Sequence, residues 1–264
     1  MAQPVRDHVC WYYDSTADLR SSMASYLTEG IARGEQVCVV ASEEFPELVD
    51  RLERLADRRA GAVQVLSVRE RYRVDDLIDG PTQVSAYAAA TEQACAAGFT
   101  GLRVAVDVTE LVRTPEQRLA FAAYEHLADR YMVAHPFTAM CAYDRALGQQ
   151  AIAELACLHP RARAGATSFH LYAVPDGVAL YGELDLASRS LLPHALANVD
   201  LVPSGGEIVV DARGIRFIDH RSLIALAEHV RPRGATLVFR THWAGAERLV
   251  ELLNLDGVRV VLEP

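Results

Sequence analysis

The chain contains no lysine, and all 26 of its basic residues are arginine. This absence excludes Schiff-base chemistry, attachment of pyridoxal phosphate and the lysine that a phosphate-binding loop places on a nucleotide. The residues after the first expected strand read DSTADLRSS, and they contain neither of the phosphate-binding motifs GxxxxGK[ST] and GxGxxG. A nucleotide triphosphatase is therefore not expected.

Long apolar runs and clustered cysteines are also missing. No apolar run reaches about 18 residues and no secretory leader opens the sequence, so we expect neither a membrane span nor secretion. The net charge of −9 disfavours binding to nucleic acid or to an anionic membrane. The scattered cysteines, without a CxxC pair, indicate a reducing cytoplasm rather than a disulfide framework. They are Cys10, Cys38, Cys95, Cys141 and Cys157.

Apolar, β-branched runs alternate with amphipathic segments over residues 1–160. Such alternation predicts an α/β domain with a doubly wound, mostly parallel sheet. The expected strands are 8–13, 36–41, 62–68, 102–108 and 137–143, and the expected helices are 19–31, 45–55, 84–97, 115–131 and 149–158. The segment 161–166, RARAGA, is polar and contains glycine, and we expect it to link this domain to a second one.

The carboxyl ends of the expected strands are rich in acids and tyrosines, and ligands bind at these ends in such sheets. One hypothesis is therefore an enzyme that acts at this acidic rim, with Asp107 or Glu125 as the general base. No nucleophile–base pair, dense histidine cluster or cofactor fingerprint supports it. A non-enzymatic protein is therefore the favoured prediction.

Six motifs in the first domain occur in a recognisable order: HVCWYYDS, YLTEGIARGEQVCVV, GLRVAVDVTEL, AAYEHL, MCAYD and LHP. Residues 1–160 resemble the MEDS family, a sensory domain of methanogen and methylotroph regulators. The resemblance implies a RecA/KaiC-like fold without a phosphate loop, and a small organic ligand. On the matching motifs it assigns ligand binding to His8, Cys10, Tyr12, Arg103, Asp107, Glu125, Cys141, Tyr143, Asp144 and His159.

Structural roles are the alternative for several of these residues. Arg103, Asp107 and Glu125 would then form a buried ion-pair network that holds a helix on the sheet. Cys10 and Cys141 would be small core residues, because free cysteine is often buried.

A metal site is a further alternative. Histidine and cysteine are ligands that zinc and iron accept. They would converge if the first and fifth strands were neighbours, although the usual clustered spacing is absent. The candidate ligands are His8, Cys10, Cys141 and His159. No cofactor follows with certainty from the sequence.

The stretch GEIVVDARGIRFIDHRSLIAL, at residues 206–226, organises the second part of the chain. It predicts a buried strand, a tight turn and a helix that Asp219 caps. His220, Arg221 and Ser222 follow on the first helical turn, where we expect them to be exposed beside the positive end of the helix dipole.

This stretch belongs to a second ordered set of motifs: LYGELDLAS, VVDARGIRFIDHRSL, GATLVFR and ERLVELLNLDGV. About residues 165–264 resemble the STAS domain of anti-sigma factor antagonists and sulfate-transporter tails, and we place the domain itself at 167–264. The resemblance implies a regulatory partner such as an anti-sigma factor. Its expected docking residues are Asp185, Ser188, Asp219, His220, Arg221 and Ser222.

The chain departs from that family at the phosphorylation site. In the antagonists the acid is followed by Ser-Ser-Gly, and a partner kinase phosphorylates the second serine. Arg221 occupies that position here, so the resemblance does not extend to the phosphoserine switch. Ser222, one position later, is an alternative acceptor.

The combined hypothesis is a cytoplasmic signalling regulator in which a small-molecule or redox sensor controls a STAS module. A metal-binding sensor and an enzyme are the alternatives. A further option is a degenerate first domain that only dimerises the STAS module, which would make the protein a homodimer.

Overall fold

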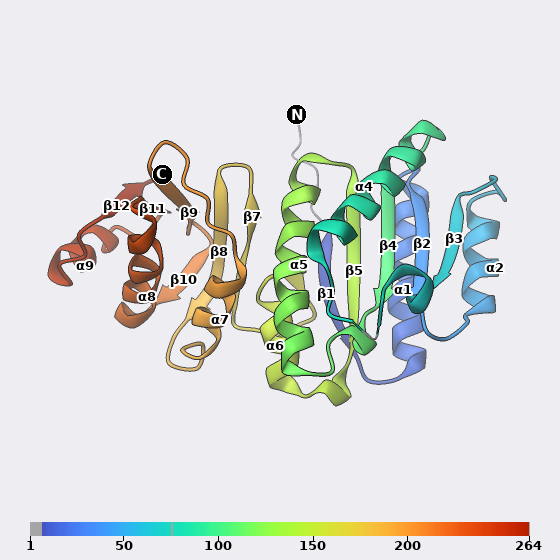
Figure 1. Cartoon of the computed structure of the whole chain (residues 1–264), viewed down its shortest axis with the longest axis horizontal. Helices are drawn as coiled ribbons and strands as arrows, with labels where there is room; N and C mark the ends of the chain where they lie inside the picture. Colours follow the sequence, from blue (N-terminus) through green and yellow to red (C-terminus); the bar gives the residue numbers. More distant parts are fainter. Residues whose placement is uncertain (1–6, 75, 264) are drawn as a thin grey trace.

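The structure is a computed structural model that describes residues 7–74 and 76–263. In this part of the chain, buried β-branched runs build a six-stranded parallel sheet with the order β3-β2-β4-β5-β1-β6 (Figure 1). Its strands are β1 (His8–Tyr13), β2 (Gln36–Ala41), β3 (Val63–Ser67), β4 (Leu102–Asp107), β5 (Phe137–Asp144) and β6 (Arg161–Ala162).

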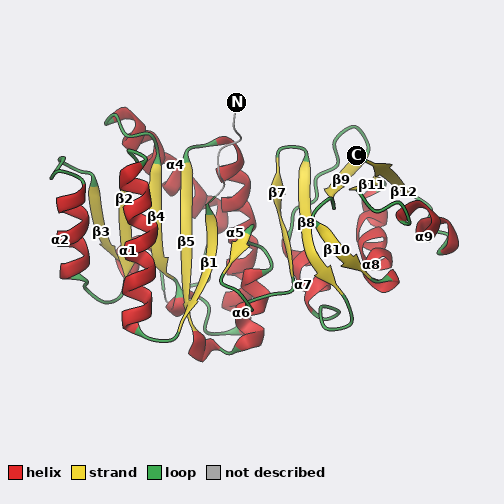
Figure 2. Ribbon diagram, turned by 180° about the vertical axis from the view of Figure 1, so that it is seen from behind, coloured by secondary structure: helices red, strands yellow, loops and turns green. Residues whose placement is uncertain are grey.

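Helices cover both faces of this sheet. Because side chains alternate along a strand, Val104 and Val106 pack towards one layer of helices and Ala105 towards the other. The layer with α1 (Thr16–Ala32) and α2 (Pro46–Leu55) faces the viewer in Figure 2. The other elements of the domain are α3 (Val68–Arg71), α4 (Gly80–Ala96), η1 (Thr109–Leu111), α5 (Pro115–Ala134), η2 (Arg145–Leu147) and α6 (Gln149–Ala156). The doubly wound α/β architecture expected from the sequence is confirmed.

The segment expected to link the two domains lies against the first sheet. Its first two residues form β6, which pairs in parallel with β1. Arg163 donates a hydrogen bond to the carbonyl of Tyr12 at 2.7 Å and forms an ion pair with Asp18 at 2.6 Å. The hydroxyl of Tyr12 in turn donates to the carbonyl of Ala164 at 2.9 Å. The connection is therefore anchored to the first domain.

The second domain has a mixed sheet with the order β10-β8-β9-β11-β12, and β7 pairs with β8 in an antiparallel hairpin. The other neighbouring strands are parallel. Its strands are β7 (Phe169–Val174), β8 (Gly177–Leu184), β9 (Glu207–Asp211), β10 (Ile215–Ile218), β11 (Thr236–Thr241) and β12 (Val258–Leu262). Its helices are α7 (Leu191–Asn198), α8 (His220–Val230), η3 (Arg231–Arg233) and α9 (Ala246–Leu252).

The two domains share one apolar core. Helix α5 lies between β5 of the first sheet and β7 of the second (Figure 1). Leu155, Phe169, Leu171 and Leu192 are buried in the same cluster, although they come from different domains. None of the described helices is long and apolar enough to cross a membrane.

Candidate functional site

Four buried polar side chains from separate segments meet between the first sheet and α5. His8 comes from β1, Cys141 from β5, Glu125 from α5 and His159 from the turn after α6. One ligand atom of each lies within 4.8 Å of those of the other three. They converge because β1 and β5 are parallel neighbours and α5 crosses the face towards which both side chains point. This set is called the cluster below.

The carboxylate of Glu125 lies at the centre of the cluster and is only 1 % exposed. Its Oε2 lies 3.0 Å from Nε2 of His8 and 3.6 Å from Nε2 of His159. Its Oε1 accepts a hydrogen bond of 3.0 Å from the hydroxyl of Tyr143. Cys141 Sγ lies 4.0 Å from Nε2 of His8.

The other ring nitrogen of each histidine has its own partner. Nδ1 of His8 lies 3.2 Å from Oδ1 of Asp129, one turn after Glu125 on α5. Nδ1 of His159 donates to the carbonyl of Leu155 at 2.9 Å, because a carbonyl only accepts. In the neutral ring, Nε2 of His159 therefore carries a lone pair, and it has no hydrogen-bond partner among the described residues.

Burial and neighbouring charges shift the pKa values of these groups. Burial alone would lower the pKa of His8, but its contacts with Asp129 and Glu125 outweigh burial and raise it to about 9. Burial would raise the pKa of Glu125, but His159 and His8 lower it to about 2. Burial and the charge of His8 lower the pKa of His159 to about 4. Burial and the charge of Glu125 raise the pKa of the Cys141 thiol.

The cluster is bonded directly to the second domain. Oδ2 of Asp129 accepts the backbone N–H of Ala173, in β7, at 2.6 Å. The backbone carbonyl of His159 accepts a hydrogen bond of 2.7 Å from Nδ1 of His170, also in β7. Two residues that contact Glu125 or His8 therefore also hold the edge strand of the second sheet.

The cluster contains three of the four metal ligands expected from the sequence. Cys10 is buried on the same face of β1 but lies outside the group of mutually close ligand atoms, and Glu125 takes its place. Asp129 was missed. Its position four residues after Glu125, on the same helix face, was the available signal.

Two acids expected at the carboxyl edge of the sheet, Asp107 and Asp144, are separate from the cluster. Asp107 accepts hydrogen bonds from the Tyr13 hydroxyl at 3.1 Å and from the Thr109 hydroxyl at 2.6 Å. Burial raises the pKa of Asp107 despite these bonds. Asp144 accepts the N–H of Ala146 at 2.8 Å and so caps η2. Both carboxylates are therefore hydrogen-bonded to neighbouring residues.

Arg103 is also separate, since it lies on the opposite face of the sheet. It is fully buried, pairs with Asp7 at 2.8 Å and Glu35 at 2.5 Å, and stacks on Tyr26 at 4.3 Å. The expected ion-pair network of Arg103 with Asp107 and Glu125 is therefore wrong. Strand alternation points Arg103 towards α1, and Asp107 lies at the far end of β4.

In the second domain, Asp219 caps α8 as expected: its Oδ1 accepts the N–H of Ser222 at 2.7 Å. His220 and Arg221 are exposed, but Ser222 is only 5 % exposed, so its expected exposure is wrong. The capping turn directs Ser222 towards the apolar side of the helix, next to Leu223.

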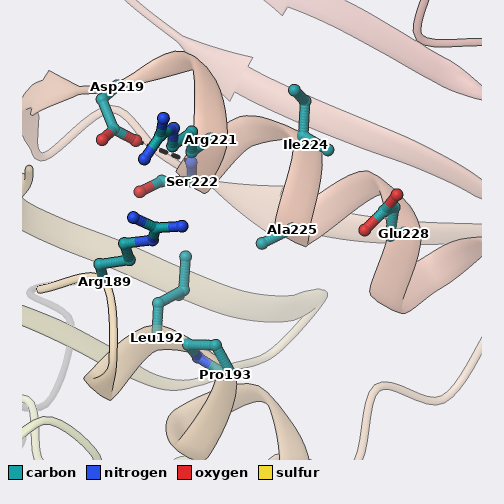
Figure 3. A pocket seen from close by; sticks show the side chains of 9 residues that line it. All are labelled: Arg189, Leu192, Pro193, Asp219, Arg221, Ser222, Ile224, Ala225 and Glu228. Carbon is teal, nitrogen blue, oxygen red and sulfur yellow. Dashed lines mark hydrogen bonds between the residues drawn. The ribbon is translucent and has the colours of Figure 1, made fainter. Parts of the chain in front are cut away.

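A surface pocket of about 450 Å³ lies at this end of α8. Figure 3 shows the guanidinium groups of Arg189 and Arg221 on opposite sides of Ser222. Leu192 and Ile224 supply part of its apolar wall. We call this the α8 pocket, lined by Arg189, Leu192, Pro193, Asp219, Arg221, Ser222, Ile224, Ala225 and Glu228.

Two further residues expected at the docking surface form the loop that leads to this pocket. Ser188 is buried, and its hydroxyl accepts the N–H of Asp185 and donates to the carbonyl of the same residue, both at 2.9 Å. Neither residue lines the α8 pocket, whereas the adjacent Arg189 does. No motif spacing identified Arg189, because its position depends on this loop.

The geometry defines a class: a parallel α/β domain with a buried polar cluster, joined through a shared core to a smaller sheet-and-helix domain. A family model described as MEthanogen/methylotroph, DcmR Sensory domain (MEDS) matches residues 7–160, and one described as Mlab, STAS domain matches residues 170–263. The chain belongs to the MEDS family and carries a C-terminal STAS domain. This combination indicates a signalling or regulatory role. A search of curated proteins found no match.

Proposed function

We propose that the protein is a cytoplasmic regulator in which the cluster senses a small molecule or redox state and controls docking of the STAS domain on a regulatory protein such as an anti-sigma factor. The observation that carries this proposal is the bond between Asp129 and the N–H of Ala173. Any rearrangement of His8 moves the carboxylate that also holds β7.

A continuous set of contacts leads from β7 to the α8 pocket. Strand β7 pairs along its length with β8, and β8 ends at Leu184. The carbonyl of Leu184 accepts the N–H of Asp219, the cap of α8, at 2.9 Å. The loop after β8 then carries Arg189 into the pocket. A shift of the hairpin would therefore change both sides of the proposed docking surface.

The α8 pocket is lined by two arginines, Arg189 and Arg221, and by two acids, Asp219 and Glu228. The carboxylate of Asp219 accepts the N–H of Ser222, and we propose that the two guanidinium groups contact an acidic partner surface. Arg189 and Arg221 are exposed and have no ion pair within the part of the chain that the structure describes. Arg221 occupies the position of the phosphoserine in antagonists, and Ser222 is buried against its cap. We therefore propose control by the sensor domain and no phosphoserine switch.

We propose no catalytic role for the acids that the sequence offered as bases. The carboxylate of Asp107 is hydrogen-bonded to Tyr13 and Thr109. The carboxylate of Glu125 is hydrogen-bonded to His8 and Tyr143. A general base needs a free path to the substrate proton.

The test uses the full chain and the protein that copurifies with it from its own cells, with affinity measured by titration of the purified pair. Arg221→Glu should weaken binding at least about tenfold through charge repulsion. Arg248→Glu, an exposed arginine on α9, is the matched control and should leave the affinity unchanged. Asp129→Asn should change the affinity although it lies away from the pocket.

Two outcomes would contradict the proposal. Equal affinities for the wild type and Arg221→Glu would remove the α8 pocket as the docking surface. An unchanged affinity of Asp129→Asn, under conditions that load or oxidise the first domain, would remove the coupling between the domains.

A further inference from the structure

We propose that the cluster is a metal site, in which Nε2 of His8, Oε2 of Glu125, Sγ of Cys141 and Nε2 of His159 bind a zinc ion. This inference goes beyond the proposed function, because metal binding is measured without any partner protein. It rests on the donor set, on the mutual closeness of the four donor atoms and on the groups that orient them.

The donor set suits zinc in both type and spacing. Zinc is bound by histidine nitrogen, cysteine sulfur and carboxylate oxygen, usually as four ligands in a tetrahedron. Such an ion places nitrogen and oxygen ligands about 3.3 Å apart and sulfur about 3.6 Å from them. In the cluster, the His8–Glu125 distance is 3.0 Å, the His159–Glu125 distance is 3.6 Å and the Cys141–His8 distance is 4.0 Å. Small side-chain adjustments would complete the tetrahedron.

Two acceptor atoms of the cluster, one on His159 and one on Glu125, lie next to each other. Nε2 of His159 carries a lone pair because its Nδ1–H is donated to Leu155, and it faces a carboxylate oxygen of Glu125 at 3.6 Å. Both side chains are at least 99 % buried. An unpartnered acceptor facing an anion in a dry interior is unfavourable. A cation between the two atoms would satisfy both.

Three groups around the cluster hold the ligands in the orientation that a metal requires. The carboxylate of Asp129 is hydrogen-bonded to Nδ1 of His8, and the carbonyl of Leu155 accepts a hydrogen bond from Nδ1 of His159. The hydroxyl of Tyr143 donates to Oε1 of Glu125, the oxygen that is not proposed as a ligand. Metal-binding histidines almost always have such partners, which fix the ring and direct the other nitrogen to the ion. A structural ion pair does not require this arrangement at His159.

A surface pocket lies next to the cluster. His8 and Asp129 line a pocket of about 190 Å³ at the amino-terminal end of β1 and β5. Its other walls include Asp7, Glu35, His135 and Arg33. Of the four cluster residues, His8 is the one that lines this pocket.

The first experiment measures metal in the full, untagged chain purified without chelator. Elemental mass spectrometry should find about one zinc ion per chain. Replacement by Co²⁺ should give the visible absorption of a tetrahedral site and a thiolate-to-cobalt band in the near ultraviolet. The cobalt spectrum does not depend on any variant, so it tests the site even if a ligand variant fails to fold.

Variants then identify the ligands. Cys141→Ser and His159→Gln should lose the ion and the thiolate band, with folding checked by circular dichroism. Cys10→Ser and Cys157→Ser are matched controls, since both replace buried cysteines outside the proposed ligand set. Both variants should still bind about one zinc ion per chain. Asp129→Asn should bind metal about 10–100-fold more weakly.

Each of the other outcomes overturns the proposal or part of it. A chain that holds no ion after incubation with Zn²⁺ or Co²⁺ and dialysis excludes the metal site. Stoichiometric iron would exclude zinc as the resident ion. Loss of metal in Cys10→Ser but not in Glu125→Gln would replace the ligand set by the four residues expected from the sequence.

Discussion

The carboxylate of Asp129 bridges the two domains: one oxygen lies 3.2 Å from Nδ1 of His8, and the other accepts the N–H of Ala173 at 2.6 Å. The two partners belong to different sheets, and Asp129 lies on the helix between them. A single buried side chain therefore depends on the geometry of both domains. Rearrangement on either side must be accommodated by the other.

Replacement of this residue should loosen the junction. Asp129→Ala removes the acceptor of two buried donors, so we expect a loss of about 1–3 kcal/mol in the free energy of unfolding. Hydrogen exchange of β7 should increase, and exchange of β12, at the other edge, should not change. Asp200→Ala is the control, because Asp200 forms an exposed pair with Arg130 and should cost at most about 1 kcal/mol. Unchanged exchange in β7 would show that Asp129 does not hold the junction.

Arg103 should be far more important for stability than for sensing. It is fully buried and pairs with Asp7 and Glu35, so Arg103→Met leaves Glu35 without its cation and removes one of the three arginines that pair with Asp7. The loss of this buried pairing should cost about 3–5 kcal/mol. Arg20→Met is the control, because the pair of Arg20 with Glu47 is exposed and should contribute at most about 1 kcal/mol. Urea denaturation of both variants checks the difference. Equal losses would refute the buried network.

Gly30, on α1, makes room for Arg103. An added Cβ would lie 2.5 Å from Cδ of Arg103, whose side chain is held by Asp7 and Glu35 and cannot withdraw. Alanine would favour the helix by about 1 kcal/mol, but overpacking costs about 1–3 kcal/mol, so Gly30→Ala should destabilise. The same change in an Arg103→Met background should become neutral or stabilising. Additive losses in the double variant, measured by denaturation, would contradict this explanation.

The sequence was sufficient for much of the fold because its strong local signals agree with the packing. The run QVCVVA is apolar throughout and forms β2 with the expected bounds, buried along its whole length. The convergence of His8, Cys141 and His159 could be predicted only on the condition that the first and fifth strands are neighbours. The structure satisfies that condition.

The residues that the sequence did not reveal depend on tertiary geometry. Asp129 required knowledge of how α5 is rotated about its axis, and Arg189 required the conformation of the loop after β8. Ser222 looked exposed because it is polar and lies on a first turn, but the cap directs it inwards. The segment 161–166 has the composition of a linker, yet its pairing with β1 follows from a free strand edge.

The cap of α8 should make a contribution to stability that depends on pH. Burial opposes ionisation of Asp219, but hydrogen bonds with Ser222 outweigh burial and lower its pKa below the ordinary value of 3.8. A lowered pKa in the folded state means that this contribution is fully present above the pKa of the unfolded chain. It is lost as the pH falls through the folded pKa.

Asp219→Ala should therefore cost about 1 kcal/mol at neutral pH. The difference between wild type and Asp219→Ala should shrink as the pH falls below the ordinary pKa of 3.8 and through the lower pKa of the folded state, because the protonated carboxyl is a weaker acceptor. Asp219→Asn is the matched control, because asparagine caps equally well but does not titrate. The difference in the free energy of unfolding between Asp219→Asn and Asp219→Ala should therefore not vary with pH. Urea denaturation of the three proteins across this range checks both statements. A parallel decline for the asparagine variant would show that other groups, and not the Asp219 cap, cause the pH dependence.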